Sequence, residues 1–108
     1  MTSSPFGGQT RTRVLLALRL LDESYPRELA RLFEVPVNGV QMALKGLERD
    51  GLVAGRMLGR TRVFSLNPRY FARDELGRFL LRLAEADADL RARVGELRRR
   101  PRRTGKPA

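Results

Sequence analysis

The apolar residues of this chain follow helical spacing in most stretches and strand spacing in one. Apolar side chains recur at helical intervals over residues 9–22, 26–33 and 38–50. Between residues 52 and 66 the pattern changes to alternation around a central glycine, and from 71 to 99 leucines recur every seven residues. The pattern predicts a mainly α fold with three helices, a small β-hairpin and one long final helix.

Proline, asparagine and glycine mark where the shorter helices begin and end. Pro26 suits a first helical turn, and Pro36 disfavours helical geometry in the residue before it. Asn38 is a good N-cap for the third helix, with Gln41 at capping-box spacing. Gly51 stands where a C′ glycine ends that helix. We therefore expect the third helix to be sharply bounded and to follow a tight turn.

The hairpin register follows from a two-residue turn at Gly59 and Arg60. This turn pairs Leu58 with Thr61, Arg56 with Val63, Gly55 with Phe64, and Val53 with Leu66. Apolar strand residues then share one face, and Gly55 leaves room for the ring of Phe64. Arg60 lies at the tip of the turn, and Arg56 and Arg62 lie just behind it.

The final helix is longer than a small domain can cover. At 1.5 Å per residue, residues 71–99 extend roughly 40 Å. The heptad leucines therefore favour pairing with a partner helix, and the first helix also has excess apolar surface. The same leucines could instead fold back on the first helix within one copy. The residues predicted to dimerise are Leu15, Leu18, Leu76, Phe79, Leu80, Leu83, Leu90, Val94 and Leu97.

These patterns divide the chain into four segments. Residues 1–8 are rich in Ser, Pro and Gly and are predicted to be flexible. Residues 9–70 form one small domain, and residues 71–100 form the long dimerisation helix. Residues 101–108 form a basic tail that is predicted to be disordered.

The composition narrows the possible chemistry. The chain has 22 basic and 12 acidic residues, a formal net charge of +10, and no Cys or His. Such a charge predicts attraction to phosphates or anionic membranes. Without thiolate or imidazole, disulfides, the usual zinc sites and Ser-His or Cys-His catalysis are excluded. We expect no metal, no cofactor and no enzymatic activity. No apolar run spans a bilayer and no signal-peptide pattern is present, so a soluble cytoplasmic protein is expected.

The second and third predicted helices have the order of a helix-turn-helix motif. Ala30 supplies the small residue that is needed where the two helices cross, and Val40 supplies the apolar one that packs back. The turn position often holds glycine in such motifs, but here it is Glu34. A left-handed conformation at this glutamate costs roughly 1–2 kcal/mol.

The stretch ELARLFEVPVNGVQMALKGLERDGLVAGRMLGRTRVFSLNPRY, residues 28–70, resembles the winged helix-turn-helix of bacterial transcriptional regulators, closest to the ArsR-like group. The amphipathic helices on either side are similar to the dimerisation helices of that group. The group's metal-sensing thiolates have no counterpart here. The resemblance implies that residues 9–70 form a DNA-binding domain, with helix 38–50 in the major groove and a wing at 52–66.

The resemblance also implies individual contacts to DNA. Amide and methionine side chains in the amino half of helix 38–50 would meet base edges, and basic side chains farther along that helix and on the preceding one would meet phosphates. The wing arginines would meet phosphate or enter the minor groove. The implied contact residues are Arg27, Arg31, Asn38, Gly39, Gln41, Met42, Lys45, Arg49, Arg56, Arg60 and Arg62.

Several of these residues have a simpler structural interpretation. Asn38 and Gln41 could serve only as a capping box, and Met42 could be surface or a packing filler. Arg31 could pair with Glu28 or with Glu34.

The leading functional hypothesis is a homodimeric, sequence-specific regulator of transcription that binds double-stranded DNA. Repression is the usual outcome in similar proteins, although the residues do not distinguish it from activation. The alternative is a winged-helix adaptor that binds protein or RNA, because fold does not determine function. An enzyme is the least favoured class, since Asp87 and Asp89 lie on a helix without partner groups that suggest a site.

Overall fold

The computed structural model describes residues 8–99. The predicted basic tail, and the predicted flexible start apart from Gly8, lie outside the described residues. Along the chain the elements are α1 (Gln9–Leu21), β1 (Glu23–Ser24), α2 (Pro26–Phe33), α3 (Val37–Arg49), β2 (Val53–Leu58), β3 (Thr61–Leu66), α4 (Arg73–Glu85) and α5 (Ala88–Arg99). The mainly α fold with a small hairpin is confirmed, and the bounds of α1, α2 and α3 agree with the prediction to within one residue.

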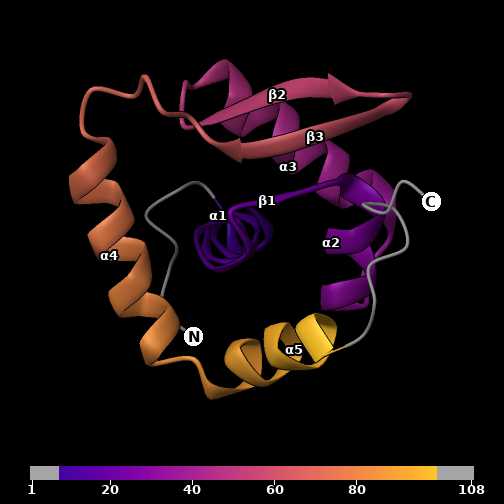
Figure 1. Ribbon diagram of the computed structural model, residues 1–108, viewed down its shortest axis with the longest axis vertical. Helices are drawn as coiled ribbons and strands as arrows, with labels where there is room; N and C mark the ends of the chain where they lie inside the picture. The colour runs from indigo at the N-terminus through magenta and orange to yellow at the C-terminus, as the bar shows by residue number, and fades with distance from the viewer. Residues whose placement is uncertain (1–7, 100–108) are drawn as a thin grey trace.

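Helix α1 forms the centre of the molecule. Figure 1 shows it end-on, with the sheet above it, α2 and α5 on two sides and α4 on a third. Its apolar side chains are buried almost all round, and Leu15 and Leu18 are 0% and 1% exposed. Their predicted role in a dimer interface is therefore wrong, because a single copy already covers both side chains. The apolar character of α1 reflects burial by the chain's own later elements.

The turn between α2 and α3 has a left-handed residue at Glu34, the position where such motifs often hold glycine. Glu34 has φ 54° and ψ 49°, and the Val35 N–H donates to the Ala30 carbonyl at 3.0 Å. The Glu34 N–H donates to the carbonyl of Arg31 at 3.3 Å, which completes a Schellman-type end to α2. Ala30 is 9% exposed and Val40 is fully buried. The helix-turn-helix is thus formed with a glutamate where glycine would be relaxed.

The amino end of α3 differs from the prediction. Pro36, in extended geometry, is the N-cap, and no side chain donates or accepts a capping hydrogen bond there. The predicted capping role of Asn38 is therefore wrong, because the helix begins one residue earlier and Asn38 lies inside its first turn. The carboxyl end agrees with the prediction. Gly51 has φ 84°, and the Leu52 N–H donates to the Leu47 carbonyl at 2.9 Å.

The hairpin has the predicted register at every pair, from Val53 opposite Leu66 to Leu58 opposite Thr61. Positive φ at Gly59 alone among the two turn residues fits a type II′ turn. A third strand was not predicted: β1 pairs antiparallel with β3, placing Ser24 opposite Phe64 and giving the order β1-β3-β2. A two-residue strand has no apolar alternation from which to predict it.

The carboxyl-terminal region contradicts the prediction of one long helix. It forms two helices, α4 and α5, and Figure 1 shows the chain turning between them so that α5 passes beneath α1. The break has a local cause. Asp87 accepts a hydrogen bond from the Leu90 N–H at 3.0 Å, so its carboxylate caps the start of α5.

The heptad leucines therefore pack within one copy, which was the predicted alternative to pairing with a partner helix. Leu80, Leu90 and Val94 are 0%, 3% and 4% exposed in the core, so their predicted role in dimerisation is wrong. The partly buried Leu76, Leu83 and Leu97 pack against the same core. Of the predicted dimerisation residues, Phe79 remains an exposed large apolar side chain.

Candidate nucleic-acid interface

The outward side of α3 is a continuous exposed stripe. Its five exposed side chains recur at helical spacing and are Asn38, Gln41, Met42, Lys45 and Arg49. The opposite side of the helix carries Val40, Leu44 and Leu47, which are at most 1% exposed. Core burial thus fixes the rotation of α3 and turns every side chain that was predicted to contact DNA toward solvent.

The wing is joined to α3 by Arg62. Its guanidinium lies 2.7 Å from the Glu48 carboxylate and 5.0 Å from the centroid of the Phe64 ring. These groups line one side of a groove of about 310 Å³, and the remaining lining residues are Pro26, Gln41, Leu44 and Lys45. The ion pair and the cation–π contact hold Arg62 against the helix instead of at the tip.

Gly55 is the position that lets the wing pack this closely. A Cβ at Gly55 would lie 2.9 Å from Cε2 of Phe64 and 3.0 Å from Nη2 of Arg62. The predicted space for the Phe64 ring is therefore confirmed, and the arginine occupies part of it. Glycine at this position lets both side chains lie flat across the strand.

The structure separates the three wing arginines. Arg56 pairs with Val63 on the face of the hairpin opposite to Arg62, and its guanidinium lies 2.6 Å from the Glu23 carboxylate. Arg60 is exposed at the turn and forms no ion pair within residues 8–99. Arg60 is therefore the wing arginine whose charge is not offset by a neighbouring carboxylate.

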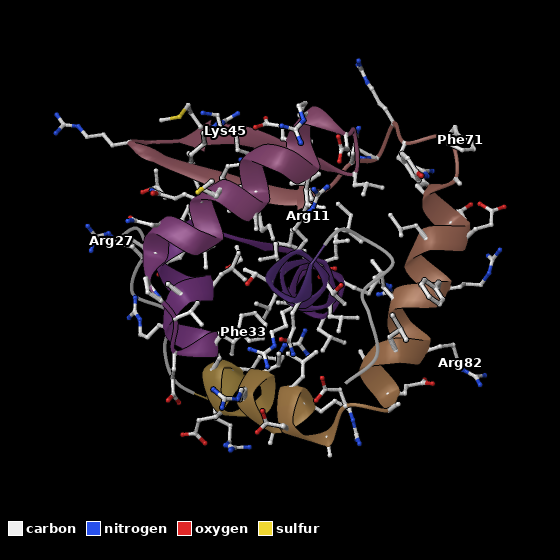
Figure 2. All side chains as sticks on the ribbon, turned by 180° about the vertical axis from the view of Figure 1, so that it is seen from behind. Arg11, Arg27, Phe33, Lys45, Phe71 and Arg82 are labelled. Atoms are coloured by element: carbon white, nitrogen blue, oxygen red, sulfur yellow. The ribbon has the colours of Figure 1, made fainter. Side chains whose placement is uncertain are left out.

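Arg27 and Arg31 extend α3's basic surface onto α2. Both are exposed, and in Figure 2 Arg27 and Lys45 project from the half of the molecule away from α4. Neither predicted partner of Arg31 is engaged with it. Glu28 is buried and accepts a hydrogen bond from Ser24 at 2.6 Å, while Glu34 pairs with Arg93.

Sequence reasoning missed the residue that anchors α3 from beneath. Arg11, on the first turns of α1, donates to the Asp50 carboxylate at 2.5 Å, just after α3 ends. Its Nη1 would lie 3.3 Å from a Cβ at Gly46, so α1 and α3 approach closely there. This hydrogen bond holds the pKa of Asp50 below its usual value. An arginine near the start of an apolar helix was the available signal, but its partner is distant in sequence.

The arrangement suits phosphate binding and offers little to catalysis. The carboxylate of Glu48 on α3 is already paired with Arg62, and that of Asp50 with Arg11. In the part of the chain that the structure describes, no three acidic side chains gather in a group that could hold a metal ion. None of the helices described here is long and apolar enough to cross a membrane.

A helix-turn-helix followed by a hairpin that packs beside its second helix defines the winged-helix fold. No protein-family model matches the chain, and no curated protein matches its sequence. Among the solved structures that share the fold are two bacterial proteins. A point mutant of ZitR from Lactococcus lactis has a TM-score of 0.63 and 17% identity, over 89% of this chain and 66% of that one. AdcR, the adhesin competence repressor of Streptococcus pyogenes, has a TM-score of 0.60 and 17% identity, over 80% and 63%. The chain thus spans about two thirds of the length of each.

Proposed function

We propose that this protein is a transcriptional regulator that binds double-stranded DNA in a sequence-dependent manner. The observation that carries the proposal is the exposed stripe of α3, where amides, a methionine and two cations face solvent beside a basic wing. A helix of this kind fits the major groove, and exposed cations at its edge fit phosphates. The shared fold of ZitR and AdcR supports this class over an enzyme.

Within this proposal, Asn38 and Gln41 are the residues that discriminate bases. The capping interpretation of both is weakened, because α3 has no side-chain cap. Amide side chains bridge the donor and acceptor of an adenine edge, and Met42, which is 74% exposed, can contact a thymine methyl group.

Cations around this stripe would position the protein on the backbone. Lys45 and Arg49 lie farther along α3, and Arg27 and Arg31 lie on α2, all of them exposed. Arg60 would reach phosphate or a narrow minor groove from the wing tip.

We further propose a homodimer that acts as a repressor in the cytoplasm. Two recognition helices would then meet half-sites about 34 Å apart. The pattern over residues 28–70 favours the ArsR-like group among winged-helix regulators. The similarity to AdcR, an adhesin competence repressor, supports the sign of regulation.

Selection of bound duplexes from a random pool, at moderate salt, tests the proposal directly. A palindromic consensus is the expected result. Gln41→Ala should then change the selected sequence more than the total affinity, because it removes an edge contact and no charge. If no duplex sequence is enriched, the proposal of sequence-specific DNA binding is wrong.

The wing can be tested by the salt dependence of binding. Arg60→Ala should weaken binding to all duplexes and reduce the slope of log affinity against log salt by about 1, the value for one lost phosphate contact. The matched control is Arg91→Ala, which removes an exposed arginine from α5. An identical slope for the Arg60→Ala variant and the parent protein would exclude the wing from the interface.

An adaptor that binds another protein remains the second candidate. Two large apolar residues on the wing, Met57 and Leu58, are 59% and 52% exposed. Apolar surface of this kind is typical of protein contacts. This function would be favoured if the duplex selection fails while Leu58→Ser abolishes binding to a protein partner.

A further inference from the structure

The outer face of α4 is a second exposed stripe, away from α3. Glu75, Phe79 and Arg82 recur at i, i+4 and i+7 and are all exposed. The other side of α4 carries Leu80 and Ala84, both fully buried against the core. One helix therefore has a core face and an outer face whose central side chain is a phenylalanine.

Large apolar groups and unmatched charges occupy this outer face. Phe79 is 46% exposed and Phe71, just before the helix, is 91% exposed. Figure 2 shows Phe71 and Arg82 at the outer edge of the molecule, near the two ends of α4. Neither Glu75 nor Arg82 forms an ion pair with any residue in the range 8–99. Exposed aromatic rings flanked by unpaired charges are typical of interaction surfaces.

We propose that this face binds the same face of a second copy, with the two α4 helices antiparallel. The two-fold axis would pass between Arg78 and Phe79, midway between Glu75 and Arg82. Each Glu75 would then face Arg82 of the second copy, and each Phe79 ring would face Arg78 of the second copy. The inference rests on the homodimer proposed above and names its surface.

The charge order of α4 is what selects a second copy as the partner. A two-fold interface places the same surface on both partners, so it requires opposite charges at equal distances from the axis. Glu75 and Arg82 meet this requirement, and Arg78 meets the ring of Phe79 in a cation–π arrangement.

The position of α4 also suits the proposed function. In Figure 2, α4 runs along one edge of the molecule and α3 lies in front of the sheet. A two-fold axis along that line of sight, beyond the outer face of α4, pairs the helices antiparallel. Because such a rotation keeps the front of the molecule at the front, both α3 helices lie on the same side of the dimer. A dimer needs this arrangement to place two recognition helices on one duplex.

The interface would be small, since each copy contributes one helix of 13 residues. Stable interfaces bury at least about 1,200 Å², and contacts smaller than this are typical of weak, transient complexes. We therefore expect a dimer that dissociates on dilution and that a duplex with two half-sites stabilises.

Sedimentation velocity of the full chain without DNA, from micromolar to near-millimolar protein, tests the proposal by charge exchange. Glu75→Arg alone and Arg82→Glu alone should each weaken self-association by about tenfold or more, because each places like charges opposite each other twice. Mixed in equal amounts, the two variants should form a heterodimer, since every facing pair is then again of opposite charge. The double variant should likewise regain self-association.

The control is Arg91→Glu, which reverses an exposed charge on α5 and should leave association unchanged. Unaltered thermal melting of all variants would show that they fold, as expected for exposed positions. If Glu75→Arg and Arg82→Glu associate like the parent protein, or if their mixture does not pair, the proposal is wrong. A parent protein that stays monomeric at every concentration also overturns it. These readouts contain no DNA, so they fail independently of the DNA-binding proposal.

Discussion

The helix-turn-helix with its wing, residues 26–66, differs from the C-terminal arm, residues 73–99, in how fully its sequence pattern specifies its structure. In the first region, turn residues and apolar spacing predict one arrangement, and the observed register agrees at each strand pair. In the arm, a seven-residue leucine repeat was compatible with a long pairing helix and with a fold-back. The structure has the fold-back: Asp87 caps the start of α5, and the later helices bury the apolar side chains of α1. A heptad repeat alone therefore does not identify a dimerisation helix.

The largest expected effect is in the arm. Leu90→Ala should lower the free energy of unfolding by about 3 kcal/mol, because a leucine that is 3% exposed leaves a cavity in the single-chain core. Urea unfolding followed by circular dichroism measures it. The loss should be the same at all protein concentrations, since the contact is within one copy. Arg91→Ala, on the next residue, should change stability by less than about 0.5 kcal/mol. A loss that grows on dilution would return Leu90 to a dimer interface.

A single added methyl group at Gly55, on the wing, should lower the stability of the protein. Gly55→Ala should cost about 1–3 kcal/mol, because the new Cβ would lie 2.9 Å from the Phe64 ring and force it or Arg62 to move. Thermal unfolding and the chemical shifts of Phe64 would report the change. Gly39→Ala is the matched control, because Gly39 lies on α3 with no atom near its missing Cβ. It should stabilise the helix by about 0.5–1 kcal/mol.

Capping separates the two regions most directly. Asp87→Ala should destabilise the protein by about 1 kcal/mol, since it removes the acceptor for the Leu90 N–H at the start of α5. Asn38→Ala should have little effect on stability, because Asn38 is not the N-cap of α3. Chemical denaturation of both variants checks this contrast. Equal losses would restore Asn38 as a cap.

The smallest effect concerns the strained turn. Glu34→Gly should stabilise the protein by up to about 1 kcal/mol, because glycine adopts φ near 54° without the Cβ penalty. Part of the gain is offset, because the substitution also removes the surface ion pair between Glu34 and Arg93, whose charged atoms lie 3.3 Å apart. Differential scanning calorimetry of Glu34→Gly and Glu34→Ala separates the two contributions. The alanine variant should lose the pair without relieving the strain.

Sequence reasoning predicted exposure more accurately for the helix-turn-helix and the wing than for α1 and the arm. All eleven predicted DNA contacts are exposed. This agreement has a physical cause, because residues that are too polar for the core of a small domain face outward whatever they contact. The sequence prediction grouped Arg56 and Arg62 just behind the turn, and the structure places them on opposite faces of the hairpin. Their ion-pair partners, Glu23 and Glu48, were not predicted, because β1 and α3 bring these carboxylates close to the wing only in the folded chain.

The buried leucines show the converse. Leu15, Leu18, Leu80, Leu90 and Val94 were recognised as an apolar set that needs a cover. Hydrophobic burial is non-directional, so an apolar stripe does not specify whether the same chain or a second copy covers it. Only Phe79 among the predicted dimer contacts was left prominent on the surface.

Local patterns were enough to predict the helix-turn-helix, the hairpin register, the glycine turns and the outward polar face of α3, because these depend on neighbours within a few residues. Three features were seen only in the folded chain: the wrapping of α1 by α4 and α5, the contact of Arg11 with the end of α3, and the lack of an ion pair at Arg60 within residues 8–99. Those features depend on groups far apart in the chain. Contacts between such groups stabilise the protein only once the whole core has formed, so patterns within a few residues do not predict them.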